Sequence, residues 1–331
     1  FDGLYEPSQA VSLVVSARND GAAVDGEIHV LTSGAGDSGG LIFSAPLSLP
    51  TGADKRVPLT IYVPPFGGSL IVRLISDGVV LAETRTNRLN SVSRDDLFYG
   101  VISPDPGGLA FLETIPGSRA DAAVAYLSLA DLPEVASAWD ALDVLILDDA
   151  DTSRLTAGQS AALQAWVESG GQLVVTGGPG GSMTAAGVAA LLPVRMRGVE
   201  SRADLPALAE FGGEAFGAPG PYVVATSDLV TGESLIDQDG LPLLAHRTLG
   251  RGSVYFLALD PKAAPLAGWP GGAALWDEIA SAAPVLPPWA WGIQDGYAAA
   301  QAVSYVQGLD LPSAWQLVLF LLLYTAIIGP I

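Results

Sequence analysis

Three aspartates follow one short apolar segment of the chain. Asp148, Asp149 and Asp151 come directly after the apolar run 144–147. Carboxylate oxygens are the ligands that Mg²⁺ and Ca²⁺ prefer in proteins, so the spacing predicts a divalent-metal site as one alternative. Aspartates in front of a helix also interact favourably with the helix dipole or cap its first turn. We favour this structural interpretation and expect no metal or other cofactor.

A second segment matches two serine-nucleophile motifs. Residues 36–40 read Gly-Asp-Ser-Gly-Gly, which fits both a chymotrypsin-type serine signature and the G-x-S-x-G elbow. An elbow requires a helix after the serine, whereas residues 41–45 have the pattern of a strand. A chymotrypsin-type site requires a histidine far upstream, and only His29 precedes the segment. We therefore predict a glycine-rich loop here.

A third segment begins like a calcium-binding loop. Residues 237–240 read Asp-Gln-Asp-Gly, but the position six residues after the glycine is His246 and not the glutamate that such a loop requires. Aspartate and glycine between two apolar runs are typical of a hairpin turn. The segment predicts a hairpin.

The composition excludes several classes of function. The chain has 35 acidic and 15 basic residues, a formal net charge of −20, which repels nucleic-acid phosphates. It contains no cysteine, so disulfides, thiolate metal sites and cysteine nucleophiles are absent. Two histidines are too few for a histidine-rich metal site.

The N-terminal part has the pattern of an all-β module. Short apolar runs recur roughly every ten residues between residues 9 and 90, as in small sandwiches. Turn residues separate them, including Asn19-Asp20-Gly21 and Asp77-Gly78. We predict an immunoglobulin-like β-sandwich over residues 1–92.

The pattern changes after residue 92 to strands that alternate with helices. Short apolar runs that predict buried strands occupy 97–102, 122–129, 144–147 and 173–176. Thr156 and Gln159 have the spacing of a capping box and open a helix that ends at Gly170. Such alternation implies right-handed crossovers and a parallel sheet, so we predict an α/β domain over 93–284.

Several of these segments carry a family resemblance. Asp143-Val-Leu-Ile-Leu-Asp148, Gln172-Leu-Val-Val-Thr-Gly-Gly178 and residues 250–260 resemble the class I glutamine amidotransferase-like domain. The terminal run 322–330 is similar to versions in uncharacterised bacterial membrane-anchored proteins. The resemblance implies a flavodoxin-like, amidotransferase-like parallel-sheet domain, an extracytoplasmic sandwich and a membrane helix.

Enzymes of this family place a cysteine in a sharp turn after a strand, activated by a His–Glu pair. The matching turn here, residues 176–182, reads Thr-Gly-Gly-Pro-Gly-Gly-Ser. Ser182, with His246 as its base, is the candidate nucleophile. A phosphate cradle is another alternative, although the lysine of a P-loop is missing; its ligand-binding candidates are Gly177, Gly178, Gly180 and Gly181. We favour a non-catalytic turn, as in a pseudoenzyme, whose glycines serve the backbone geometry.

The C-terminal segment 315–331 has no charged residue, which predicts a transmembrane helix over 313–331 that continues beyond the chain. The alternative is a buried core helix. Residues 285–312 are predicted to be a juxtamembrane linker with a short helix. Four aromatic residues are expected at the membrane interface, with domain packing or a partner site as alternatives; they are Trp289, Trp291, Trp315 and Tyr324.

The leading hypothesis is a non-catalytic, acidic scaffold or binding component of a bacterial envelope complex. We expect it in the cell membrane with its body on the extracytoplasmic side. Its expected partners are other membrane or envelope proteins and the lipid bilayer, through 313–331, but no nucleic acid. One alternative is a hydrolase or metal-dependent enzyme that uses Asp148, Asp149 or His246 at the carboxyl edge of the α/β sheet. Another is a small-ligand or glycan sensor.

Overall fold

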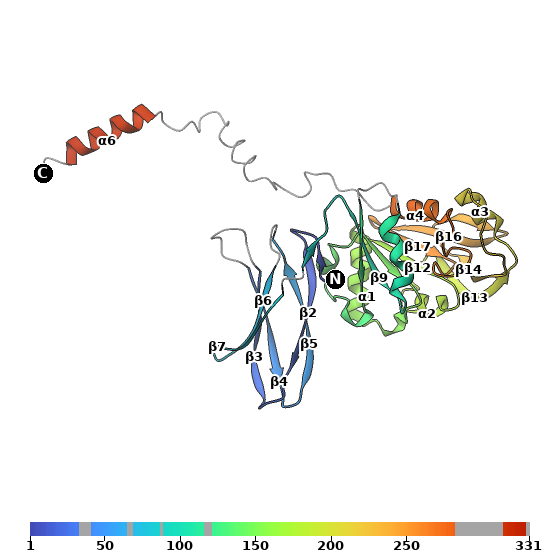
Figure 1. Cartoon of the computed structure of the whole chain (residues 1–331), viewed down its shortest axis with the longest axis horizontal. Helices are drawn as coiled ribbons and strands as arrows, with labels where there is room; N and C mark the ends of the chain where they lie inside the picture. Colours follow the sequence, from blue (N-terminus) through green and yellow to red (C-terminus); the bar gives the residue numbers. More distant parts are fainter. Residues whose placement is uncertain (33–40, 65–68, 87–88, 116–120, 282–313, 329–331) are drawn as a thin grey trace. The chain divides into compact units, whose positions relative to one another are not determined.

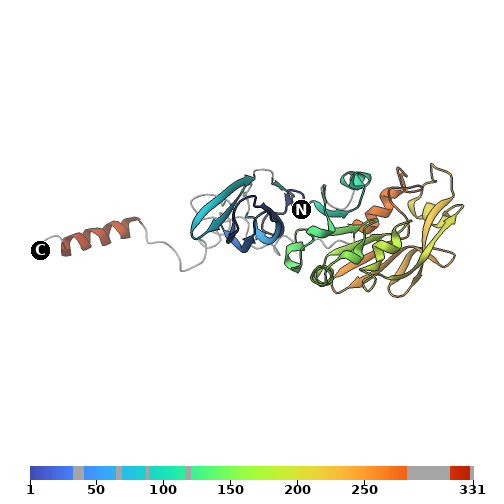
Figure 2. The same cartoon turned by 90° about the horizontal axis from the view of Figure 1, so that it is seen from below.

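The computed structural model describes residues 1–32, 41–64, 69–86, 89–115, 121–281 and 314–328. The chain forms two compact units, Phe1–Pro284 and Val285–Ile331. Figures 1 and 2 show the first unit in blue to orange and the C-terminal helix α6 (Ala314–Ile328) in red. The glycine-rich loop predicted at 36–40 and the linker 285–312, with Trp289 and Trp291, lie outside the described residues.

The N-terminal module contains two antiparallel sheets (Figure 1). The two-stranded sheet pairs β2 (Ala10–Arg18) with β5 (Asp54–Tyr62). The four-stranded sheet has the order β4-β3-β6-β7, with bounds Ile42–Leu49, Val24–Thr32, Leu70–Ser76 and Val79–Thr86. Apolar residues of both sheets form the buried core of the module, among them Val11, Ile28, Val30, Leu49, Ile61 and Leu70. A short parallel pair joins β1 (Leu4–Tyr5) to β8 (Asn90–Ser91).

The predicted turns at both hairpins are confirmed. Asp77 and Gly78 connect β6 to β7 with φ values of 50° and 77°. Asp239 and Gly240 connect β15 (Glu233–Gln238) to β16 (Leu241–Leu249) with φ values of 58° and 82°. Two successive positive φ values match the right-handed twist of the flanking strands, which is why aspartate and glycine occupy these positions.

A seven-stranded sheet forms the centre of the α/β part, in the order β10-β9-β11-β12-β17-β16-β15. The first five strands in this order are parallel to one another, whereas β16 is antiparallel to β17 and β15 is antiparallel to β16. The sheet is therefore mixed and not purely parallel as predicted, because the turn at Gly250 folds β17 back beside β16 in the antiparallel direction. The bounds are Ala122–Tyr126, Leu97–Ile102, Val144–Leu147, Gln172–Thr176, Gly252–Leu257, Leu241–Leu249 and Glu233–Gln238. A separate antiparallel pair contains β13 (Val194–Arg202) and β14 (Tyr222–Leu229).

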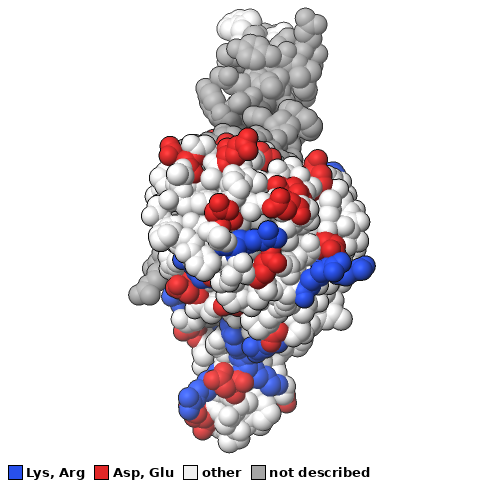
Figure 3. Space-filling view, turned by 90° about the vertical axis from the view of Figure 1, so that its right-hand side faces the viewer, with Lys and Arg blue, Asp and Glu red and all other residues white. Residues whose placement is uncertain are grey.

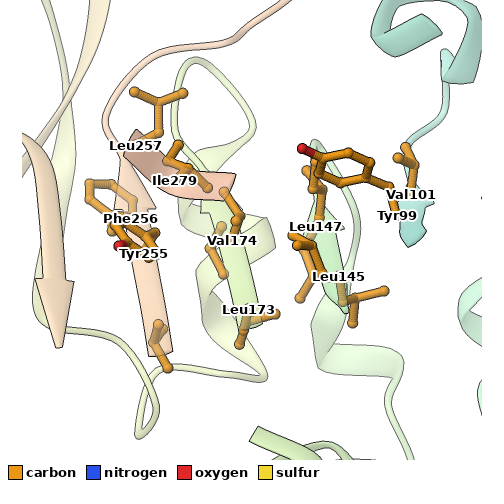
Figure 4. Close-up of a cluster of buried hydrophobic side chains, with 14 of the residues drawn as sticks. Tyr99, Val101, Leu145, Leu147, Leu173, Val174, Tyr255, Phe256, Leu257 and Ile279 are labelled. Atoms are coloured by element: carbon orange, nitrogen blue, oxygen red, sulfur yellow. The ribbon is translucent and has the colours of Figure 1, made fainter. Parts of the chain in front are cut away.

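The central strands are buried on both faces. Every residue of β9, β11 and β12 is buried. Strands covered on both faces require the continuous apolar runs that the sequence contains. Figure 4 shows some of these side chains with Tyr255, Phe256 and Leu257 of β17, and Ile279 of α4 (Gly272–Ser281) beside them. The face of this unit in Figure 3 carries acidic and basic side chains interspersed with wide uncharged areas.

Among the described residues, the α/β part contains four α-helices. They are α1 (Ala157–Ser169), α2 (Gly181–Ala186), α3 (Pro206–Gly212) and α4 (Gly272–Ser281). The predicted capping box of α1 is confirmed, since Thr156 Oγ1 accepts from the Gln159 N–H at 3.0 Å and Gln159 Oε1 accepts from the Thr156 N–H at 3.0 Å. Gly170, with φ 133°, ends the helix as predicted. Short 3-10 helices complete the unit: η1 (Pro106–Thr114), η2 (Leu129–Asp131), η3 (Ala136–Trp139) and η4 (Thr152–Arg154).

The predicted fold class is wrong at its C-terminal end. Helix α6 comprises Ala314–Ile328, which is 15 residues. At 1.5 Å per residue it is about 22 Å long, against about 30 Å for the hydrocarbon layer. Among the described residues, no helix combines the length and apolarity needed to cross a membrane. The predicted span, and the membrane location and extracytoplasmic orientation that depended on it, are therefore corrected.

Candidate functional site

The carboxyl ends of four parallel strands bring polar side chains together. Strands β9, β11, β12 and β17 are neighbours with the same direction, so they end at one edge of the sheet. Ser103 follows β9, Asp148 follows β11, Thr176 ends β12, and Asp260 and Lys262 lie shortly after β17. Open α/β sheets bind ligands at this edge, which makes it the first place to look for a site.

Asp148 is the centre of this group. The whole residue is buried, with 1% of its surface exposed to solvent. Thr176 Oγ1 donates to its Oδ1 at 2.7 Å, and Ser103 Oγ donates to its Oδ2 at 2.7 Å. The Lys262 ammonium also donates to Oδ2 and forms an ion pair with it. Both carboxylate oxygens are therefore occupied by donors from the protein.

Lys262 is held between two aspartates. Its Nζ lies 3.5 Å from Asp260 Oδ1, and its backbone N–H donates to the same oxygen at 2.8 Å. Burial by itself lowers the pKa of Lys262, but the hydrogen bond and charge of Asp148, followed by those of Asp260, raise the pKa above its ordinary value. The amine consequently stays protonated and serves as neither a nucleophile nor a general base at neutral pH.

The glycines predicted as ligand-binding residues pack against protein atoms. Gly178 has φ 83°, and a Cβ there would lie 2.9 Å from Asp260 Cβ. A Cβ at Gly177 would lie 2.6 Å from the Ala258 carbonyl, and one at Gly180 would lie 1.7 Å from Asp149 Oδ1. Gly181, the first residue of α2, is also buried. The loop thus uses its glycines to approach the loops after β11 and β17.

The three aspartates of the predicted cluster have separate roles. Asp148 is buried in the network above, whereas Asp149 is exposed and has φ 48°. Asp151 precedes η4 and accepts from Ser153 Oγ at 2.5 Å. Within the described ranges, no group of three or more histidine, cysteine, aspartate or glutamate side chains has an arrangement that could hold a metal ion.

The candidate serine and histidine are not brought together. Ser182 is exposed in α2, after β12, whereas His246 lies on β16, and β17 separates these two strands. His246 Nε2 lies 3.3 Å from Ser253 Oγ, and its Nδ1 lies 3.5 Å from Glu233 Oε1. The histidine ring also packs on the Tyr255 ring at 4.6 Å between centroids.

Sequence reasoning missed Ser103, Thr176 and Lys262. One signal was available, because Lys262 is one of only two lysines in an acidic chain, the other being Lys55. Lys262 and Asp148 are 114 residues apart, so no local pattern pairs them. Of the predicted interface aromatics, Trp315 and Tyr324 are 71% and 55% exposed on α6.

Solved structures with a similar arrangement are distant. A cytoplasmic protein from Salmonella typhimurium has 15% identity and a TM-score of 0.42, over 55% of this chain and 95% of its own. A second, from Salmonella typhimurium LT2, has 15% identity and a TM-score of 0.41, over 56% and 99%. The exo-β-1,4-mannosidase Op5Man5 from Opitutaceae bacterium strain TAV5 has 17% identity and a TM-score of 0.36, over 55% of this chain and 35% of its own. At these values the likenesses carry no argument about function.

No curated protein matches the chain. Two family models do match parts of it, and neither spans half of its length. Residues 1–88 match a domain of unknown function (DUF8726), and residues 125–265 match a second domain of unknown function (DUF7408).

Proposed function

We propose that this chain is a non-catalytic binding or scaffold component of a protein complex. The observation that supports this most directly is the occupied state of Asp148. A general acid or base must exchange a proton with a substrate that reaches it. Asp148 is 1% exposed and already accepts from Lys262, Ser103 and Thr176.

A structural role accounts for the same network. The ion pair connects the loop after β11 with the loop after β17, and Thr176 adds the end of β12. Removing one partner of a buried pair leaves an uncompensated charge, which typically destabilises a protein by about 3–5 kcal/mol. Ser103 adds the segment after β9, so the network holds four segments in place at the edge where an enzyme of this architecture would keep its substrate.

The proposal is tested by measuring turnover of glutamine, esters and peptides by the purified chain. We expect none above the rate without protein. Turnover that is lost in Asp148→Asn, with the variant still folded by circular dichroism, would overturn the proposal. Asp54→Asn is the matched control, since Asp54 is exposed on β5 and the substitution removes the same negative charge elsewhere.

A serine hydrolase is the second candidate function. It is favoured by the distances of 3.3 Å from His246 Nε2 to Ser253 Oγ and 3.5 Å from His246 Nδ1 to Glu233 Oε1. These groups have the order of a nucleophile, a base and an orienting carboxylate. A fluorophosphonate probe tests it: labelling of Ser253 that disappears in His246→Gln supports a hydrolase, and an unlabelled Ser253 excludes it.

A further inference from the structure

Strand β7 is an exposed edge strand of the N-terminal module. Strand β7 is the last in its sheet, and among the described residues it pairs only with β6. Seven of its eight residues are exposed. They include Val79, Val80 and Leu81, at 59%, 47% and 50%. A strand at the edge of a sheet directs a row of backbone donors and acceptors away from its neighbour, so it can act as a template for another strand.

The two edges of this sheet differ in how they are protected. Strand β4, at the other end, contains Pro46, which cannot donate to a further strand. Strand β7 reads Val-Val-Leu-Ala-Glu-Thr-Arg-Thr and contains neither proline nor lysine, the residues that commonly block an edge. Its one irregularity is the bulge beside Leu81, between the pairs Leu74–Ala82 and Ile75–Val80. Residues Ala82–Thr86 after it remain regular.

We propose that β7 pairs in antiparallel fashion with β7 of a second copy of this chain, about a two-fold axis at Thr84. The inference rests on the proposed binding function and names its partner. Around a two-fold axis perpendicular to a sheet, directly opposite residues have side chains on the same face. One residue of the strand must therefore lie directly opposite its own copy, with the axis between the two. In the regular part of β7 the central choices for this residue are Glu83, Thr84 and Arg85.

Charge selects Thr84 among these choices. An axis at Glu83 places two glutamates opposite each other, and an axis at Arg85 places two arginines opposite each other. Like charges directly opposite destabilise a strand pair, whereas opposite charges stabilise it. An axis at Thr84 places Glu83 of each copy opposite Arg85 of the other, which forms two complementary pairs.

The intramolecular contacts of β7 are compatible with this register. Arg73 on β6 is directly opposite Glu83, and its Nε donates to Glu83 Oε2 at 2.8 Å. Arg85 is exposed on the same face of β7. In the pair, Arg85 of the second copy approaches Glu83 from the side away from Arg73, so each glutamate lies between two arginines. The opposite face presents Ala82, Thr84 and Thr86, which are small enough for close strand approach.

A single introduced cysteine tests the axis. The chain has no cysteine, so Thr84→Cys creates one thiol per copy. Directly opposite Cα atoms in an antiparallel pair are about 4.5–5.5 Å apart, within the range of a disulfide. We expect mild oxidation to link Thr84→Cys into a covalent dimer and to leave Ser48→Cys, exposed on β4, as a monomer. Equal linkage of both variants, or linkage of neither, would overturn the proposed pairing.

Complementary charge variants identify the partner. Sedimentation of the full chain is expected to show a dimer, with Kd about tenfold weaker or more in Glu83→Lys and in Arg85→Glu, since each places like charges opposite twice. A mixture of the two variants restores both pairs, so it is expected to form a heterodimer near the native Kd. A monomeric native chain, or a dimer that neither variant weakens, contradicts the β7 pairing. Neither result affects the proposal for the carboxyl edge, which is tested by turnover.

Discussion

Lys262 forms an ion pair with Asp148, a carboxylate that is 1% exposed and 114 residues away in the sequence. The two residues differ in which other partners remain if the ion pair is lost. Lys262 also has Asp260 at 3.5 Å, whereas Asp148 without Lys262 retains only the hydroxyls of Thr176 and Ser103. The pair is therefore asymmetric, and its two ends are expected to respond differently to substitution.

Lys262→Met is expected to lower the free energy of unfolding by about 3–5 kcal/mol, because it leaves the Asp148 carboxylate buried without its counter-ion. Asp148→Asn should lower it less, since Lys262 keeps Asp260. The double variant should be more stable than Lys262→Met alone, as no uncompensated charge remains. Urea unfolding measures all three, and Lys55→Met should differ from the native chain by less than about 0.5 kcal/mol. Additive losses in the double variant would contradict a direct pair.

Stability is expected to fall at high pH through Lys262. Its pKa is raised above the ordinary 10.5, so its contribution is present below pH 10.5 and is lost as the pH rises through the folded-state value. Thermal melts at pH values from about 9 to about 12 should show a melting temperature that falls more steeply with pH for the native chain than for Lys262→Met. Parallel curves for the two proteins would show that the ion pair makes no pH-dependent contribution.

Tyr255 adds to the same alkaline decline. Burial, followed by the charges of Glu278 and Glu233, raises its pKa from 10.0 to about 12. The folded state thus holds a proton that the unfolded state releases, and stability falls as the pH rises from 10 towards 12. Tyr255→Phe cannot titrate and should flatten this part of the curve, although it leaves the contact with the His246 ring. An unchanged slope in Tyr255→Phe would contradict the raised pKa.

The glycine turn is expected to depend on Gly178 more than on Gly180. Gly178→Ala forces an alanine to φ 83° and places its Cβ 2.9 Å from Asp260 Cβ, so it should destabilise by about 1 kcal/mol or more. Gly180→Ala meets Asp149 Oδ1, the mobile end of an exposed side chain that can rotate away. Ser182→Ala is exposed and should change stability by less than about 0.5 kcal/mol. Thermal melts rank the three, and a large loss in Ser182→Ala would contradict its surface position.

The capping box of α1 offers a local comparison. Thr156→Ala removes the hydroxyl that accepts from the Gln159 N–H and should destabilise the protein by about 1 kcal/mol. Thr156→Ser keeps the acceptor and is the matched control. Equal urea midpoints for the alanine variant and the native chain would show that the cap makes no measurable contribution.

The sequence alone determined the elements that local chemistry specifies. Alternating and continuous apolar runs predicted the strands from β9 to β12, because a strand buried on one or both faces must have that pattern. Thr156 with Gln159, and Asp77 with Gly78, predicted a helix start and a hairpin turn, since these contacts join residues close in the chain. The absence of cysteine already excluded a cysteine nucleophile.

Only the tertiary structure decided what the carboxyl edge contains. Strand order brings Ser103, Asp148, Thr176 and Lys262 together from four separate segments, and no spacing in the sequence encodes that order. The same holds for His246, whose neighbour is Ser253 through the β16–β17 pairing and not Ser182. Hydropathy predicted an apolar C-terminal segment but not the length of its helix, because where α6 begins and ends depends on backbone geometry that apolarity alone does not specify. The exposed edge of β7 likewise follows from sheet order, since an edge strand and a central strand can have similar sequences.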